Sequence, residues 1–290
     1  MRIVYHLGAH CTDDDRLVRC LLKNRALLAD QGITVPSPTR YRKLLRDTVM
    51  QLRGQTASEE TQALVLQQIM DEPEADRLIL SWPSFLSFPA WALRGSLYAQ
   101  AGERVRAFTR IFPDAEAEFH LSLRNPATFL PSLQDAVNAK GREDILTGVD
   151  PLQLRWSDAV RQILIHNPGI PLTVWCNEET PLIWPEVLQA VSGHTPGLTL
   201  VDDDDLLASI MTEIGMGRMT AYCAEHPPQS VTQRRRITTA FLEKFARPEV
   251  VEQEITLPGW TDEVVQSLTY AYLQDVERIR RLPGVTFIEA

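Results

Sequence analysis

Short β-prone runs alternate with longer stretches of helical periodicity along this chain of 290 residues. Strands that are separated by helices pair in parallel, and the sheet they form needs helices on both faces. The alternation therefore predicts one α/β domain over residues 1–290, with three layers and a mainly parallel sheet. The predicted strands cover residues 3–7, 77–82, 118–123 and 171–176, with 197–201 as a fifth strand or edge element and 285–288 as a closing strand.

The intervening stretches have apolar residues at three- and four-residue spacing, which is typical of amphipathic helices. In the first of them, Leu17, Leu21 and Leu28 follow this spacing, and Gly32 stands where a glycine ends a helix. No long linker rich in Pro, Gly or Ser interrupts the pattern, which favours a single domain. The predicted helices cover residues 13–31, 42–53, 59–71, 89–112, 151–166, 230–246 and 261–281, with one more behind Pro126.

The composition is that of a globular protein, with 44% hydrophobic and 23% charged residues. A net charge of −9 disfavours non-specific binding to nucleic acid or to an anionic membrane. No apolar run approaches the ~18 residues that a membrane span needs, and the apolar N-terminal stretch is too short for a signal peptide. The cysteines lie far apart and predict reduced thiols, so we expect a cytoplasmic protein. They are Cys11, Cys20, Cys176 and Cys223.

In parallel sheets, ligands bind beyond the carboxyl ends of the strands, so the residues that follow each strand are informative. The third strand ends at Leu123-Arg124-Asn125-Pro126, and Ser132 follows eight residues after Arg124. A guanidinium and a hydroxyl two helical turns apart suit a phosphate, because both donate hydrogen bonds to its oxygens. The alternative is an arginine paired with a local carboxylate and a solvated serine.

The first strand ends at Gly8, and a short loop leads to the next helix through Cys11, Thr12 and the run Asp13–Asp15. A strand, a glycine and a helix N-terminus form the geometry of phosphate-binding loops. The GxxxxGK[ST] signature is missing, however, and three aspartates oppose an anion. In the alternative interpretation Thr12 is the N-cap and the aspartates stabilise the first helical turn.

Together the two exits resemble the bacterial branch of the sulfotransferases that use 3′-phosphoadenosine-5′-phosphosulfate (PAPS) and have the P-loop nucleotide-binding fold. That branch opens with a strand and His-Ile-Gly-x-x-Lys-Thr-Gly-Thr-Thr, and has a later strand ending Leu-Arg-(Asp/Asn)-Pro with a serine eight residues after the arginine. The matching residues here are His6–Asp15, then Asn24-Arg25, Gly32-Ile33 and Pro36, and finally Leu123–Pro126 with Ser132. More loosely, Trp156 and Tyr270–Asp275 resemble the family's order of elements.

The resemblance implies that PAPS is the cofactor, with Gly8, Thr12, Arg124 and Ser132 as binding residues, the last two at the 3′-phosphate. It implies sulfuryl transfer to a hydroxyl or amine of an unidentified small-molecule or glycan acceptor. The departures lie in the first loop, where Cys11 stands for the family's lysine.

In the same loop, Asp13 stands for the family's second glycine, and Asp14 and Asp15 stand for its hydroxyl residues. The catalytic base is not indicated, although His6 and His10 lie close by in sequence. Two hypotheses therefore remain. The chain is either a divergent sulfotransferase or a sulfotransferase-like binding or regulatory protein without transferase activity. The sequence indicates no oligomeric state.

Three further patterns are weaker. The run Asp202–Asp205 lacks the alternating spacing of a calcium loop and predicts a solvated turn and helix start. His6, His10 and Asp13–Asp15 could gather a divalent metal, but nothing dictates a further ligand, and no metal site is predicted. Arg234–Arg236 is either a solvated basic face or, as the resemblance implies, a segment that helps to hold the 3′-phosphate. The GxSxG signature of serine hydrolases is missing.

Overall fold

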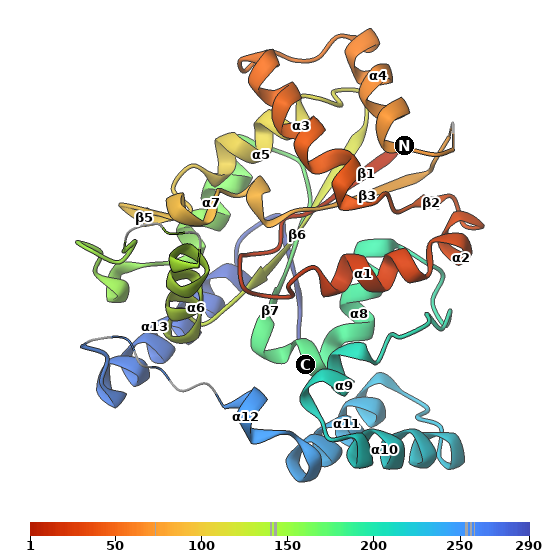
Figure 1. Cartoon of the computed structure of the whole chain (residues 1–290), viewed down its shortest axis with the longest axis vertical. Helices are drawn as coiled ribbons and strands as arrows, with labels where there is room; N and C mark the ends of the chain where they lie inside the picture. Colours follow the sequence, from red (N-terminus) through yellow and green to blue (C-terminus); the bar gives the residue numbers. More distant parts are fainter. Residues whose placement is uncertain (73, 140, 142–143, 253–254, 256, 258) are drawn as a thin grey trace.

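A computed structural model describes residues 1–290 except 73, 140, 142–143, 253–254, 256 and 258. Its centre is a six-stranded, all-parallel sheet in the order β2-β3-β1-β6-β7-β8 (Figure 1). The strands are β1 (Arg2–His6), β2 (Ile33–Thr34), β3 (Arg77–Ser81), β6 (Glu116–Leu123), β7 (Leu172–Cys176) and β8 (Val285–Ile288). A small antiparallel hairpin pairs β4 (Leu93–Arg94) with β5 (Ser96–Leu97).

Helices cover both faces of the sheet, because successive residues of each strand point to opposite sides. Tyr5 packs among the helices of one face and Val4 among those of the other. The first face is covered by α3 (Pro38–Leu52), α4 (Glu59–Ile69), α5 (Ala101–Thr109), α6 (Pro126–Asn138), α7 (Trp156–His166) and α13 (Asp262–Arg280). The second is covered by α1 (Arg16–Lys23), α2 (Arg25–Ala29) and α8 (Thr180–Ser192). The three-layer prediction is thereby confirmed.

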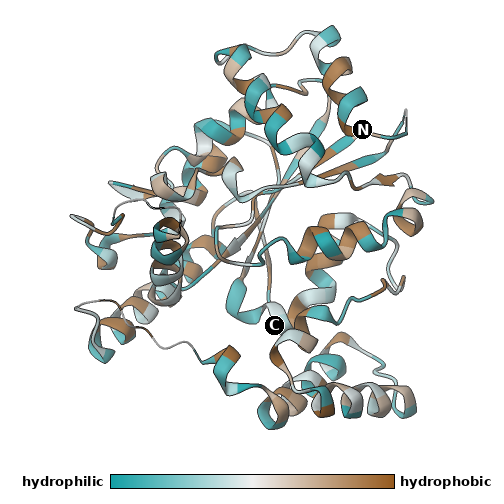
Figure 2. Ribbon diagram, in the orientation of Figure 1, coloured by the Kyte–Doolittle hydropathy of each residue, from teal (hydrophilic) through white to brown (hydrophobic). Residues whose placement is uncertain are grey.

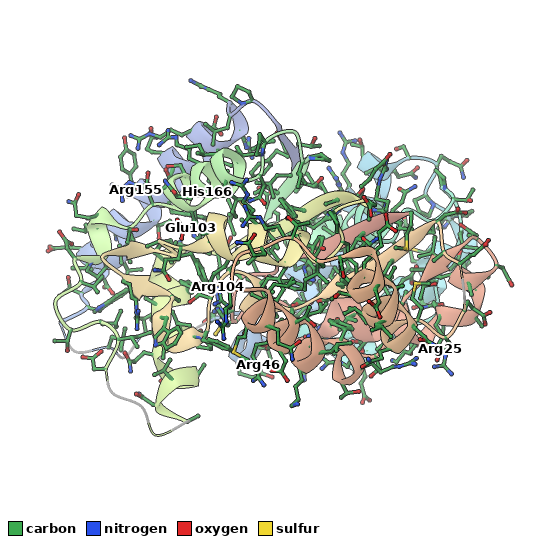
Figure 3. All side chains as sticks on the ribbon, turned by 90° about the horizontal axis from the view of Figure 1, so that it is seen from above. Arg25, Arg46, Glu103, Arg104, Arg155 and His166 are labelled. Atoms are coloured by element: carbon green, nitrogen blue, oxygen red, sulfur yellow. The ribbon has the colours of Figure 1, made fainter. Side chains whose placement is uncertain are left out.

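The hydrophobic residues concentrate along the central strands and on the helix sides that face them (Figure 2). Seen from above in Figure 3, Arg25 of α2 and Arg155, just before α7, lie on opposite sides of the molecule. In the same view Glu103 of α5 lies beside His166 of α7, and their side chains are 3.8 Å apart. The helices of the first face thus also contact one another.

A group of short helices projects from the body at the bottom of Figure 1. It has a small hydrophobic cluster of its own around Leu207, Met211 and Met219. Its helices are α9 (Asp205–Ile210), α10 (Glu213–Glu225), α11 (Val231–Phe245) and α12 (Pro248–Val251). Short 3₁₀ helices lie between these elements at η1 (Pro83–Phe85), η2 (Pro89–Trp91), η3 (Pro151–Gln153) and η4 (Asn177–Glu179).

Three element predictions need correction. The predicted helix 13–31 begins only at Arg16 and is divided at Asn24, whose side chain bonds the main chain of Val201 through both of its polar atoms. The same bonds hold 197–201 as a loop rather than a strand. Residues 89–112 form η2, the β4–β5 hairpin and α5 instead of one helix. Among the described residues, no helix is long and apolar enough to cross a membrane.

Candidate functional site

The connections that leave β1 and β6 run in opposite directions. β1 and β6 are neighbours, but the chain after β1 passes through α1 and α2 to β2, whereas the chain after β6 passes through α6 and α7 to β7. α/β proteins with such a divergence bind their ligands in a crevice outside the carboxyl ends of the two strands. The topology therefore places the candidate site between the loop after β1 and the residues after β6.

The strand exits that the sequence singles out meet at this edge of the sheet. His6 is in register with Ser81 of β3 and with His120 of β6, and Leu123 is in register with Cys176. Gly8, Trp82 and Arg124 therefore leave from the same edge. This prediction is confirmed.

Arg124 and Ser132 are brought together by the first turns of α6. Arg124 Nη2 donates to Ser132 Oγ at 3.0 Å, and Arg124 Nε donates to Thr128 Oγ1 at 3.2 Å. Residues 124, 128 and 132 share one side because they are spaced by four. Arg124 Nη1 also donates to the carbonyl oxygen of Cys11, so the arginine is fastened to the β1 loop. Burial lowers the pKa of this guanidinium from its usual value.

The main chain of Arg124 and Asn125 is anchored by residues that the sequence did not identify as part of the site. The indole of Trp156 donates to the carbonyl oxygen of Arg124 at 2.8 Å. The amide of Asn125 donates to Glu178 at 2.7 Å, and Glu178 also accepts from Tyr272 at 3.0 Å. Asn125 caps α6 through its side chain, which accepts from the amide of Ala127. The Asn-Pro pair in the sequence could have indicated the helix start and its cap. The contacts of Glu178 and Tyr272 could not be predicted, because both residues are distant from Asn125 in the sequence.

The loop from Gly8 to Asp15 is a series of tight turns. Gly8 has φ +37°, and a Cβ there would lie 3.2 Å from the His6 ring. Cys11, Asp14 and Asp15 are also left-handed, with φ of 57°, 48° and 62°. Non-glycine residues in this region are strained, and such strain is concentrated at functional sites. Gly8 and Thr12 shape this loop, and it contacts Arg124 through the carbonyl oxygen of Cys11.

Thr12 and the three aspartates do not have the roles that the capping interpretation assigned to them. Thr12 donates to the carbonyl oxygen of Ala9 at 2.7 Å, and α1 begins at Arg16 with no acidic residue in its first turn. Only Asp13 serves the helix by its side chain, which accepts from the amide of Leu17 at 3.1 Å.

Asp14 and Asp15 differ in their surroundings. Asp14 is exposed. Asp15 forms a bidentate ion pair with Arg42 of α3 at 2.5 and 3.0 Å. The sequence indicated three aspartates whose charges oppose an anion. In the structure Arg42 neutralises one of them, so fewer than three negative charges remain unpaired against a bound anion.

Cys11 does not replace the charge of the family's lysine. Burial raises the pKa of its thiol to about 11, so the side chain is neutral at physiological pH. It therefore supplies neither a cation nor a reactive thiolate at this position.

The two histidines near the loop make contacts that fix their rings. His6 Nδ1 lies 2.8 Å from Ser81 Oγ, the His6 ring stacks on Trp175, and burial lowers the pKa of His6. His10 Nδ1 lies 2.7 Å from the hydroxyl of Tyr98, which also accepts from the main-chain amide of His10. Each contact orients one of the two imidazole rings.

The remaining sequence candidates lie away from this crevice. Asp202 pairs with Lys23, and Asp205 pairs with Arg16 at the start of α9, so the acidic run is a turn and helix start. Arg234 and Arg235 both pair with Glu186 of α8. Among the described residues, no group of three or more His, Cys, Asp or Glu side chains is arranged to hold a metal ion.

A cavity of about 840 Å³ lies at the opposite, amino edge of the sheet and is lined by Met1, Gly32 and Asp76 among others. Its acidic rim at Asp71 and Glu72 does not suit an anion. Topology and side-chain chemistry therefore favour the carboxyl edge. No protein-family model, curated protein or solved structure matches the chain. The resemblance to sulfotransferases thus depends on the motif residues themselves.

Proposed function

We propose that this protein is a sulfotransferase-like protein that binds a PAPS-type nucleotide in the crevice between β1 and β6. In this proposal Arg124 and Ser132 bind the 3′-phosphate, and the β1 loop with Gly8 and Thr12 lies beside the phosphosulfate end. The observation that carries it is the Arg124–Ser132 contact of 3.0 Å at the carboxyl edge. Two donors at that separation can reach oxygens of one phosphate.

The surroundings of Arg124 favour binding, since its guanidinium is oriented by Thr128 and by the carbonyl oxygen of Cys11. A pre-oriented guanidinium loses less side-chain freedom when a ligand binds. The all-parallel sheet, with a divergence of connections at the same edge, also suits a nucleotide. Any acceptor is a small molecule or a glycan that carries a hydroxyl or amine.

We propose further that sulfuryl transfer is very slow or absent. Transfer of such a group depends on positive charge around it. Here Cys11, at the position of the family's lysine, is a neutral thiol. The competing hypothesis, an active transferase, predicts that adenosine 3′,5′-bisphosphate is released from PAPS when acceptors are added. Chromatography of the nucleotide products distinguishes the two.

The binding proposal is tested by calorimetry with adenosine 3′,5′-bisphosphate and with adenosine 5′-monophosphate (AMP), which lacks the 3′-phosphate. The wild type should prefer the bisphosphate. In Arg124→Ala that preference should fall by roughly tenfold to a hundredfold, because charge-assisted hydrogen bonds contribute about 1.5–3 kcal/mol. Ser132→Ala should reduce it less, since a neutral hydroxyl is the weaker donor.

Arg247→Ala is the matched control, because Arg247 also donates to a main-chain carbonyl, that of Ser209 in the projecting helices. It should bind like the wild type. Equal affinity of the wild type for the two nucleotides, or binding of neither, would show that Arg124 and Ser132 hold no 3′-phosphate.

A further inference from the structure

Arg42 is a second guanidinium at the same edge of the sheet. It lies on α3, and its Nε and Nη2 atoms donate to the carbonyl oxygen of Ser81 at 3.1 and 2.9 Å. Ser81 ends β3, the neighbour of β1 on the side away from β6. Arg42 and Arg124 therefore flank the β1 loop on its two sides. Sequence reasoning missed Arg42 because it stands 27 residues from Asp15, its partner in the loop.

The Nη1 and Nη2 atoms of Arg42 bind a carboxylate of the protein itself, that of Asp15. Nη1 and Nη2 donate to the two carboxylate oxygens of Asp15 at 3.0 and 2.5 Å. This forked arrangement is the one by which arginine also binds phosphate and sulfate groups. Both side chains remain partly accessible, with 23% of Arg42 and 36% of Asp15 exposed. A ligand from solvent can therefore reach the pair.

The turn that delivers Asp15 is strained. Asp14 and Asp15 are consecutive non-glycine residues with φ of 48° and 62°, and Asp15 stands at the N-cap position of α1 without capping it by its side chain. The ion pair with Arg42 helps to hold this conformation. Displacement of the carboxylate would allow the turn to relax. The strain energy released would offset part of the free energy lost with the ion pair.

We propose that Arg42 is an anion-binding residue of the ligand site, and that Asp15 occupies its place in the free protein. The ligand is then a molecule with two separate anionic groups, of which one binds Arg124 and Ser132 and the other displaces Asp15 from Arg42. The identity of this ligand as an adenosine phosphate rests on the proposed function above. Arg42 thus supplies the positive charge that the β1 loop lacks. Asp15 weakens ligand binding because its carboxylate competes for the Arg42 guanidinium.

The test compares Asp15→Asn with the wild type in calorimetry with the 3′-, the 5′- and the 3′,5′-phosphates of adenosine. Removing the competing charge should raise affinity for the 5′- and 3′,5′-phosphates about tenfold or more, the value of a charge-assisted hydrogen bond. Affinity for the 3′-monophosphate should stay unchanged. The double variant Asp15→Asn with Arg42→Gln should lose the gain.

Asp14→Asn is the matched control, because it removes the same charge from the adjacent, exposed residue of the same turn. It should gain at most about twofold, since the site is partly screened. An equal gain in Asp14→Asn and Asp15→Asn would overturn the proposal, because net charge alone would then explain both.

Inorganic sulfate separates this proposal from the proposed function. Sulfate should raise the Tm of Asp15→Asn more than that of Asp14→Asn, and the double variant should lose the difference. If no adenosine phosphate binds but this difference is found, the nucleotide is wrong and the Arg42 site stands. If Arg124→Ala abolishes the preference for the bisphosphate but Asp15→Asn gains nothing with either probe, the Arg42 proposal is wrong and the proposed function stands.

Discussion

Arg124 shows how a single residue can be positioned by a strand, a helix and a loop at once. It directly follows β6, its guanidinium donates to Thr128 and Ser132 of α6, and it also donates to the carbonyl oxygen of Cys11. The left-handed φ of 57° at Cys11 belongs to the turn that presents this carbonyl group to the arginine. The contact joins the two strand exits that border the crevice.

A second set of charged residues lies on β3 and β6. Arg77 of β3 and His120 of β6 both bond the carboxylate of Glu118. Burial alone would raise the pKa of Glu118, but the hydrogen bonds from His120 and Arg77 outweigh it and the pKa is lowered. The carboxylate therefore stabilises the fold above its unfolded pKa, and that contribution is lost as the pH falls through its lower folded value.

The buried histidines make stability depend on pH. Burial lowers the pKa of both His6 and His120, so the folded state resists protonation while the unfolded state takes up protons below about pH 6.5. Stability should therefore decrease as the pH falls from 7 to 5, by up to about 1.4 kcal/mol per pH unit for each histidine. Urea unfolding across this range measures the slope.

His120→Gln removes one of the buried histidines, so the slope between pH 7 and 5 should be shallower than in the wild type. The glutamine amide can still donate to Glu118. The exposed His226 provides the control, because His226→Gln should follow the wild-type slope. A His120→Gln slope identical to the wild type would contradict this explanation.

At the scale of elements, the packing of α10 on α11 depends on a glycine. A Cβ at Gly215 would lie 2.4 Å from Phe245 Cβ and 2.9 Å from Met211 Cγ, so the two helices approach closely there. Gly217, two residues further along the same helix, has nothing within 4 Å of a Cβ. The two glycines therefore have opposite packing environments on one helix.

Gly215→Ala should destabilise the protein by about 1–3 kcal/mol, because the added methyl group overpacks the contact with Phe245. Gly217→Ala should stabilise it by up to about 1 kcal/mol, since alanine is the better helix former and meets open space. Urea unfolding of the two variants gives the comparison. Equal effects of the same sign would show that α10 does not pack on α11 as described.

At the scale of the whole molecule, the hydrophobic interior has three parts. Two large clusters lie on the two faces of the sheet, and the third, around Leu207, Met211 and Met219, lies within the projecting helices. Arg234 and Arg235 attach these helices to the body through Glu186, and Arg16 attaches them through Asp205. A small cluster that is attached to the body by these ion pairs and by the packing of Leu206 contributes less stability than a covered sheet.

Hydrogen exchange should therefore be uneven across the chain. The amides of α10 and α11 should exchange faster than those of β1 and β6, because local opening of the projecting helices exposes little apolar surface. Exchange followed by mass spectrometry of peptides measures this directly. Uniform protection across 205–247 and the sheet would instead show one cooperative unit without a weaker part.

The α/β alternation and the strands β1, β3, β6, β7 and β8 could be predicted from sequence alone, whereas β2, α8 and α10 could not. The reason is physical: apolar periodicity and strand exits are local properties, and parallel strands bring their carboxyl ends to one edge. The start of α1 and the break at Asn24 could not be predicted, because a long-range bond to Val201 overrides local helix propensity. The prediction of a strand at 197–201 was wrong for the same reason, since Asn24 bonds the main chain of Val201.

The sequence by itself thus determined the α/β class and the common sheet edge at which the predicted strands end. The tertiary structure alone decided the roles of the aspartates. Asp13 caps an amide of α1, whereas Asp15 is neutralised by Arg42 from another helix. The charge of a loop depends on the groups that the fold packs against it, and these come from distant parts of the chain. For that reason an acidic run that opposes an anion in sequence is partly compensated in three dimensions.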